Sequence, residues 1–132
     1  MTSKQLIKEI QYFLNHLFPL ERSLTGKGNR ETLSFIKGLV PIKILEIPSG
    51  KKVYDWQVPN EWHVREAWIK NSDGNKILDF KRNNLHLLGY SSPIKKVLNF
   101  LQLKNHLHYI DNKPDTIPYR TSFYKDQWGF CL

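Results

Sequence analysis

The sequence predicts an α+β fold in which two N-terminal helices precede a β-rich module, a short helix and a returning strand. Three observations lead to this prediction. Apolar residues recur with the helical period near the N-terminus, the period changes to two from about residue 41 to 92, and the segment from Tyr119 to Leu132 returns to the composition of a strand. Prolines and glycines punctuate the middle region in the manner of a small sandwich or half-barrel.

Residues 3–18 are predicted to form an amphipathic helix, because their apolar side chains fall on one stripe. Thr2 and Gln5 have the spacing of a capping box, in which each side chain accepts a hydrogen bond from the other residue's backbone. Pro19 marks the end of the helix, since proline cannot continue the hydrogen-bond ladder. The stripe consists of Leu6, Ile10, Phe13 and Leu17, widened by Ile7, Leu14 and Phe18.

A glycine-bearing loop, residues 22–28, leads to a second predicted helix over residues 30–39. Asn29 is the expected N-cap, Glu31 in the first turn complements the helix dipole, and Pro41 follows the end of the helix. The loop lacks the residue spacing of a Walker phosphate-binding loop, so we expect no nucleotide there.

The middle region is predicted to contain strands over residues 42–48, 62–69, 76–80 and 85–88. The first two runs alternate between the two sides of an extended chain, as residues of a half-buried strand do. Asp73-Gly74 lies between the second and third runs and tolerates the positive φ of a hairpin turn. A β-hairpin is therefore expected at this point.

The third region begins with a helix that either Ser92 or Asn99 could cap, and the shorter helix, from Asn99 to about His108, is the favoured alternative. A turn over residues 111–115 follows. The segment from Tyr119 to Leu132 is then expected to return to a strand.

Composition and charge limit the function classes. Among 132 residues, 40% are hydrophobic, which excludes a disordered tail, and no apolar run approaches the roughly 20 residues of a membrane span. The net charge of +8 comes from scattered basic residues without a nucleic-acid-binding motif, so neither a nucleic-acid nor a membrane partner is expected. A single cysteine and the absence of a signal-peptide pattern predict a cytoplasmic location.

No metal site is predicted within the chain. The five histidines are not accompanied by an HExxH motif or by paired cysteines. His106 and His108 would diverge by about 200° on the predicted helix. Glu61 and His63 share a face of a predicted strand, and a structural role is favoured there over an acid–base pair. Cys131 is assigned to packing.

Three groups of motifs make the sequence more specific. In this order they resemble the N-terminal part of a bacterial family of aminopeptidase-like zinc metallopeptidases, within the co-catalytic zinc aminopeptidase superfamily. The motifs are Leu17-Phe18-Pro19 with Arg22-Ser23-Leu24-Thr25-Gly26 and Arg30-Glu31-Thr32-Leu33; Pro48-Ser49-Gly50 with Val53-Tyr54-Asp55-Trp56-Gln57-Val58-Pro59-Asn60-Glu61-Trp62; and Ile117 to Tyr124 with Trp128-Gly129-Phe130-Cys131-Leu132.

The resemblance implies an α/β zinc-peptidase core with an inserted β-rich domain, of which this chain is an incomplete portion. Residues 1–40 would be the N-terminal helices of the core, residues 41–115 the insert, and residues 116–132 the truncated return into the core. The reaction of the complete family is hydrolysis of an N-terminal peptide or peptide-like amide bond.

The family's zinc ligands, a set of histidine and acidic residues, would follow the position of Leu132. Zinc is therefore expected for the complete family and not for this chain alone, and no catalytic residue is assigned here. The chain is expected to be inactive alone and to need a missing C-terminal catalytic portion before it acts on a peptide-like substrate.

Five residues are predicted to contact substrate. Arg120, beside Tyr119, needs an acidic partner among its apolar neighbours, which would be a structural carboxylate or a substrate group; structural pairing is the first expectation. Arg22 and Ser23 would either brace the core or approach a substrate terminus. Trp56 lies in a predicted loop where its ring could stack on a ligand.

A second function remains open from the sequence. The chain would then be a non-catalytic interaction module that binds a protein or glycan partner through the β-rich insert. Zinc binding separates the two alternatives, because an enzyme of this kind must hold the metal.

Overall fold

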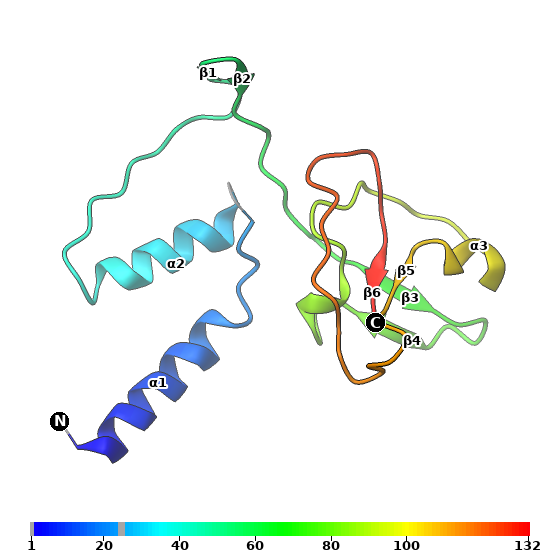
Figure 1. The fold of residues 1–132 in the computed structure, drawn as a ribbon, viewed down its shortest axis with the longest axis horizontal. Helices are drawn as coiled ribbons and strands as arrows, with labels where there is room; N and C mark the ends of the chain where they lie inside the picture. The colour runs from blue at the N-terminus through cyan, green and yellow to red at the C-terminus, as the bar shows by residue number, and fades with distance from the viewer. Residues whose placement is uncertain (1, 24–25) are drawn as a thin grey trace. The chain divides into compact units, whose positions relative to one another are not determined.

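The computed structural model describes residues 2–23 and 26–132 and separates the chain into two units, Met1–His63 and Val64–Leu132. Leu24 and Thr25 of the predicted loop lie outside the described residues. Figure 1 shows helices at the start of the first unit and short strands in both units. This mixture of helices and small strands confirms the predicted element types. The assignment of the chain to core and insert stays a prediction.

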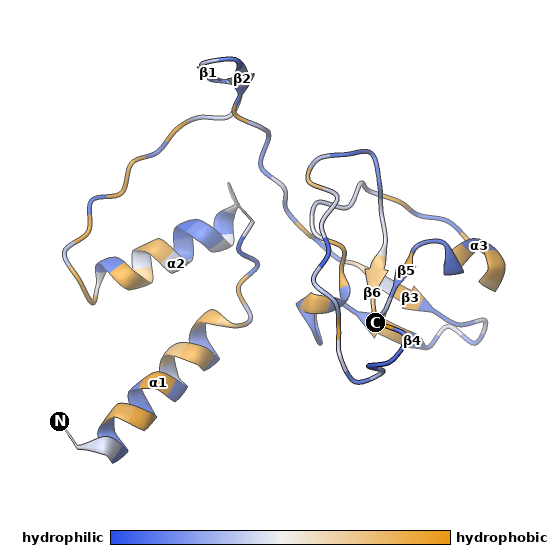
Figure 2. Cartoon of the chain, viewed as in Figure 1, coloured by the Kyte–Doolittle hydropathy of each residue, from blue (hydrophilic) through white to orange (hydrophobic). Residues whose placement is uncertain are grey.

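The first helix, α1, spans Ser3–Leu17 and has the predicted capping box, in which the Thr2 hydroxyl accepts from the Gln5 backbone N–H at 3.4 Å. Its apolar residues are coloured orange in Figure 2, yet none of its described residues is buried. Within the described residues, no helix combines the length and apolar character that crossing a bilayer requires.

The second helix, α2, spans Lys27–Lys37 and begins earlier than predicted. Gly26, not Asn29, is the N-cap, and its carbonyl accepts from the backbone N–H of Asn29 at 3.1 Å. The prediction was wrong because it relied on side-chain capping, whereas this helix begins with a backbone cap. Phe35 of α2 packs edge-on against Phe13 of α1, with ring centroids 5.7 Å apart.

The remainder of the first unit contains a small antiparallel hairpin of β1 (Lys52–Val53) and β2 (Trp56–Gln57). The strand predicted over residues 42–48 is not assigned, although this part of the chain is drawn as an open, extended trace in Figure 1. A strand requires a hydrogen-bonded neighbour, and none of the described segments supplies one for these residues.

In the second unit, β3 (Trp68–Lys70) and β4 (Lys76–Asp79) form the predicted antiparallel hairpin. Gly74 occupies the turn at φ +84°. The predicted strand over residues 62–69 is shorter than expected, because only its end pairs with β4. The predicted strand at 85–88 is wrong: residues Asn84–His86 form a 3-10 turn, η1, which begins where the Asn83 side chain accepts from the Leu85 N–H at 3.1 Å.

Asn99 caps the third helix, as predicted, and also forms a capping box with Gln102, but α3 spans only Phe100–Lys104. His108 lies instead in β5 (Leu107–His108), which pairs in parallel with β6 (Phe130–Cys131). The predicted C-terminal strand is reduced to β6. The chain bends before His106 because the His106 N–H bonds to the Leu103 carbonyl at 2.8 Å, closing the helix with a tight turn. Leu88, Phe130 and Cys131 are the buried hydrophobic residues of this unit.

Candidate functional site

The best-defined candidate site is the turn of residues 121–124, which is fixed to the segment of residues 88–91. Ser122 is only 3% exposed, and its hydroxyl donates to the Tyr90 carbonyl at 2.7 Å and lies 3.2 Å from the Gly89 carbonyl. The Ser122 N–H donates to Gly89 at 2.8 Å, and the Gly89 N–H donates to the Arg120 carbonyl at 3.1 Å. These bonds fix both backbone and side chain of the turn.

Three aromatic residues at this junction have left-handed backbone conformations, with φ values of 61° at Tyr90, 46° at Phe123 and 63° at Tyr124. Such a conformation costs about 1–3 kcal/mol for a residue with a side chain, so the surrounding contacts must hold it. The Tyr90 ring lies 4.5 Å from that of Tyr124 and 6.0 Å from that of Phe123, measured between centroids. The result is an aromatic cluster on a preorganised turn.

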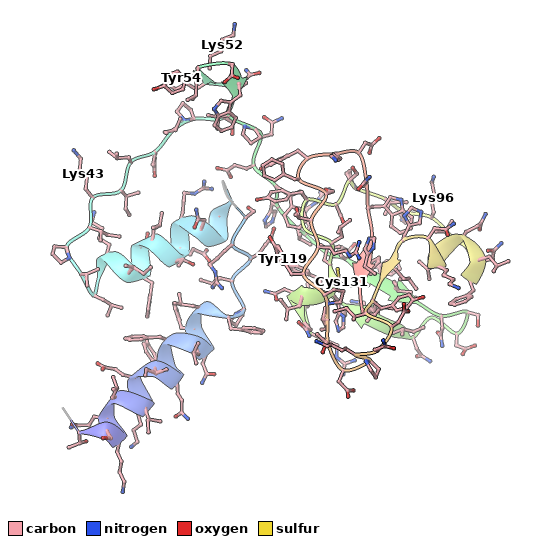
Figure 3. The ribbon with its side chains drawn as sticks, in the orientation of Figure 1. Lys43, Lys52, Tyr54, Lys96, Tyr119 and Cys131 are labelled. Atoms are coloured by element: carbon pink, nitrogen blue, oxygen red, sulfur yellow. The ribbon has the colours of Figure 1, made fainter. Side chains whose placement is uncertain are left out.

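Tyr119 and Arg120 precede this turn, and both side chains are exposed, Tyr119 to 87%. Figure 3 shows Tyr119 beside the turn region of its unit. The predicted structural carboxylate for Arg120 is not found, since no ion pair joins Arg120 to an acidic residue in the described parts of the chain. A contact between Arg120 and substrate stays a prediction.

Arg120 also affects the two ionisable residues that face each other in the β5–β6 pair. Burial lowers the pKa of His108 below its usual 6.5, and the positive charges of Arg120 and His106 lower it further. Burial raises the pKa of the Cys131 thiol, partly offset by the backbone N–H and the charge of Arg120. Because Cys131 is 1% exposed, its thiol is packed and stays neutral, and a nucleophilic role is not supported.

Two histidines of the second unit, His86 and His106, bind backbone carbonyls. Nδ1 of His86 lies 2.8 Å from the Cys131 carbonyl, and Nδ1 of His106 lies 3.1 Å from that of Trp128, on whose ring His106 also stacks. Across residues 2–23 and 26–132, no three histidine, cysteine or acidic side chains gather closely enough to hold a metal ion. The residues present here therefore do not fit a zinc site.

In the first unit, Arg22 and Ser23 make structural contacts. The Arg22 guanidinium donates to the Leu17 carbonyl, and the buried Ser23 hydroxyl donates to the Trp62 carbonyl at 3.2 Å. A Cβ on Gly26 would lie 2.1 Å from the Ser23 hydroxyl oxygen, which explains the glycine there. The Arg22 contact lies at the end of α1 and the Ser23 contacts lie at the start of α2, and a role in substrate binding for Arg22 and Ser23 stays a prediction.

Glu61 forms an ion pair with Arg30 of α2, with a second contact between Glu61 Oε2 and the guanidinium at 3.0 Å. The hydrogen bond to Arg30 lowers the pKa of Glu61, and the same bond raises the pKa of Arg30. This pairing confirms the structural interpretation of Glu61 over an acid–base role with His63. It was not predicted from the sequence, because nothing in the spacing of positions 30 and 61 brings them together.

Trp56 lies on β2 and is 54% exposed, and Tyr54 at the hairpin turn is fully exposed with φ of 54°. Figure 3 shows Tyr54 at the end of this hairpin. Backbone hydrogen bonds from Gly50 to Val58 and from Val58 to Lys51, both 2.9 Å, extend the hairpin beyond its strands. Both rings are thus exposed on a hydrogen-bonded hairpin, and a ligand contact for Trp56 stays a prediction.

The predicted contact residues are divided between the units: Arg22, Ser23 and Trp56 lie in the first, and Tyr119 and Arg120 in the second. Sequence reasoning missed Ser122 and Tyr90. The only signal in the sequence was the position of Ser122 between Thr121 and Phe123 in an aromatic motif, which did not reveal that Tyr90 is its partner.

Comparisons with known proteins agree with the resemblance. A protein of Clostridium acetobutylicum described as "Putative polysaccharide biosynthesis protein with aminopeptidase-like domain" is 48% identical over 124 residues, which are 94% of this chain and 29% of that protein. The crystal structure of a "putative peptidase" from the same organism superposes with a TM-score of 0.88 at 46% identity, over 97% of this chain and 30% of the other.

The chain thus spans about three-tenths of the length of these two proteins. Its likeness to part of a protein with an aminopeptidase-like domain, predicted from the motifs, is confirmed. A family model described as a domain of unknown function, DUF2172, matches residues 61–132, which is more than half of the chain. The chain therefore belongs to the DUF2172 family.

Proposed function

We propose that this chain is the N-terminal portion of an aminopeptidase-like zinc hydrolase that cleaves an N-terminal peptide or peptide-like amide bond. The observation that carries the proposal is the superposition of 97% of the chain on three-tenths of a structure described as a "putative peptidase". Because the described residues do not fit a zinc site, the ligands would come from the part of the longer protein that this chain does not match. The chain alone is then inactive.

Within this function, Arg120 and Tyr119 are the residues proposed to contact substrate. Arg120 is exposed and has no acidic partner in the described residues, so its guanidinium can hold a carboxylate of a peptide-like substrate. Ser122 positions both residues by fixing the turn that follows them.

The test uses a hybrid protein, in which this chain replaces the matching region of the Clostridium protein. Leucyl-anilide hydrolysis and zinc content are measured on the hybrid and on the chain alone. The proposal expects zinc-dependent turnover only in the hybrid. Arg120→Ala should raise KM for a substrate with a free carboxylate by about tenfold, the value of one charged hydrogen bond, whereas Lys104→Ala should not. A folded, zinc-loaded hybrid without turnover would refute it.

A glycan-binding role is the second candidate, favoured by the exposed rings of Tyr54 and Trp56 and by the words "polysaccharide biosynthesis" in the description of the Clostridium protein. Aromatic rings on a rigid hairpin can stack on sugars. Titration of the chain with bacterial polysaccharide, using tryptophan fluorescence, tests this role, and Tyr54→Ala with Trp56→Ala should abolish any binding that is found.

A further inference from the structure

Residues 42–47 have the features of a β-strand, but no described strand is hydrogen-bonded to them. The segment is extended, and Ile42, Ile44 and Ile47 are β-branched residues that favour strands. Pro41 and Pro48 bound a run of six residues, which is an ordinary strand length. Yet in the described residues no backbone hydrogen bond involves residues 43–47.

The two faces of the segment differ in their surroundings. Ile42 and Ile44 are half-buried, and Glu46 on the same face lies close enough to raise the pKa of Arg30 on α2. On the other face, Leu45 is 77% and Ile47 58% exposed. Figure 3 shows Lys43 projecting outward from this segment. Apolar residues on both faces are typical of a strand inside a sheet that is covered on both sides.

The first unit also exposes many large apolar side chains. Among the described residues of this unit, Val58 is the one buried hydrophobic residue. Four apolar residues of α1 are each more than two-fifths exposed: Leu6, Ile7, Ile10 and Leu14. Figure 2 shows orange residues along α1 and along the segment that follows α2. Such a surface marks a site of contact with other polypeptide.

We infer that residues 42–47 add as a strand to a β-sheet formed by the part of the longer protein that this chain does not match. This proposal rests on the proposed function, because it assumes that the chain works within a longer protein. The occupant is inferred from length, because about seven-tenths of each Clostridium protein lies outside the region that this chain matches. Backbone hydrogen bonds would supply the affinity of the segment for the sheet, and Leu45 and Ile47 would be buried on the sheet's covered face.

Hydrogen–deuterium exchange tests the inference on the chain alone and on the hybrid protein. In the chain alone, the amides of residues 43–47 should exchange almost as fast as in an unfolded peptide. In the hybrid they should be protected by about 100-fold or more, since exchange then requires the ladder to open. Leu45→Asn should reduce this protection about tenfold while leaving the unfolding of the chain alone unchanged. The matched control Lys43→Asn, on the same face, should have no effect.

Two results would overturn the inference. Unprotected amides at 43–47 in a hybrid whose α1 and α2 are protected would mean that the segment is a linker. Protection that rises with concentration in the chain alone would mean that a second copy is the occupant. If the hybrid does not fold, the same measurement is made on the unaltered Clostridium protein, over the residues aligned with 43–47. Exchange is independent of turnover, so a protected but inactive hybrid refutes only the hydrolase proposal.

Discussion

The hydroxyl of Ser122 donates to the carbonyl oxygen of Tyr90 across 2.7 Å, and this bond joins two backbone segments that both contain left-handed residues. Because Ser122 is buried, water cannot replace the hydroxyl if it is lost. The contact therefore links the stability of the unit to the conformation of the turn beside Tyr119 and Arg120.

Ser122→Ala should lower the free energy of unfolding by about 1–3 kcal/mol, because it removes the hydrogen bonds that a buried hydroxyl makes. Urea unfolding followed by tryptophan fluorescence measures this change. Ser72→Ala, at an exposed position of the β3–β4 hairpin, is the matched control and should change stability by less than about 0.5 kcal/mol. Equal, small effects of both substitutions would contradict the importance of the bond.

Gly28→Ala should destabilise the chain by about 1–3 kcal/mol through overpacking. An added Cβ would lie 1.9 Å from the Glu21 carbonyl oxygen, which is backbone and cannot move aside easily. Thermal unfolding by circular dichroism measures the effect. Gly38→Ala is the control, since its Cβ would meet Phe35 at 3.3 Å, and it should be close to neutral. A Gly28→Ala protein as stable as the parent would mean that α2 begins differently.

Arg120→Gln should raise the pKa of His108, because one of the two cations that disfavour its protonated form is then removed. Burial is the larger cause, so the pKa should still remain below the usual 6.5. NMR titration of the His108 ring protons measures it, with Lys104→Gln as a control that should leave it unchanged. If Arg120→Gln left the pKa of His108 unchanged, the guanidinium would lie too far from His108 to affect it.

The same lowered pKa predicts how stability depends on pH. Because His108 binds a proton less readily in the folded chain than in the unfolded chain, protonation favours unfolding. The contribution of neutral His108 to the free energy of unfolding should be fully present above about pH 6.5 and should diminish as the pH falls below that value. In His108→Gln, the urea midpoint should change less between pH 7 and pH 5 than in the parent chain. An identical pH dependence in both proteins would contradict this prediction.

The ion pair of Arg30 and Glu61 predicts an effect on a titration. The pKa of Glu61 is held below its usual 4.5, chiefly by the hydrogen bond from Arg30, so Arg30→Gln should raise it. Carboxyl-carbon NMR measures the midpoint, and Lys27→Gln, on the same helix, should leave it unchanged. Both side chains are about half exposed, so we expect little change in stability. If Arg30→Gln left the titration midpoint of Glu61 unchanged, the ion pair would not persist in solution.

The sequence predicted the elements whose causes are local. The capping box at Thr2, the cap at Asn99 and the Asp73-Gly74 turn depend on neighbouring residues, and all three were found. It failed where the deciding partner is distant or absent. The alternation of residues 42–48 predicts a strand, but a strand needs a hydrogen-bonded neighbour. The apolar pattern at 85–88 also predicted a strand, whereas the Asn83 side chain accepts from the Leu85 N–H and begins a 3-10 turn there.

The candidate site follows the same division. Tyr119 and Arg120 could be singled out because an arginine among aromatic residues is chemically unusual. Ser122 and Tyr90 could not, because their bond joins residues 32 positions apart. The lack of an acidic partner for Arg120 in the described residues is likewise a property of the fold and not of the local sequence.

Leucyl-anilide hydrolysis by the hybrid protein and by the chain alone, each with its zinc content, tests the central claim most directly. The claim predicts zinc-dependent turnover by the hybrid and neither turnover nor stoichiometric zinc in the chain alone. Turnover by the 132-residue chain with bound zinc would contradict it, since the described residues would then have to form a metal site that their arrangement does not provide.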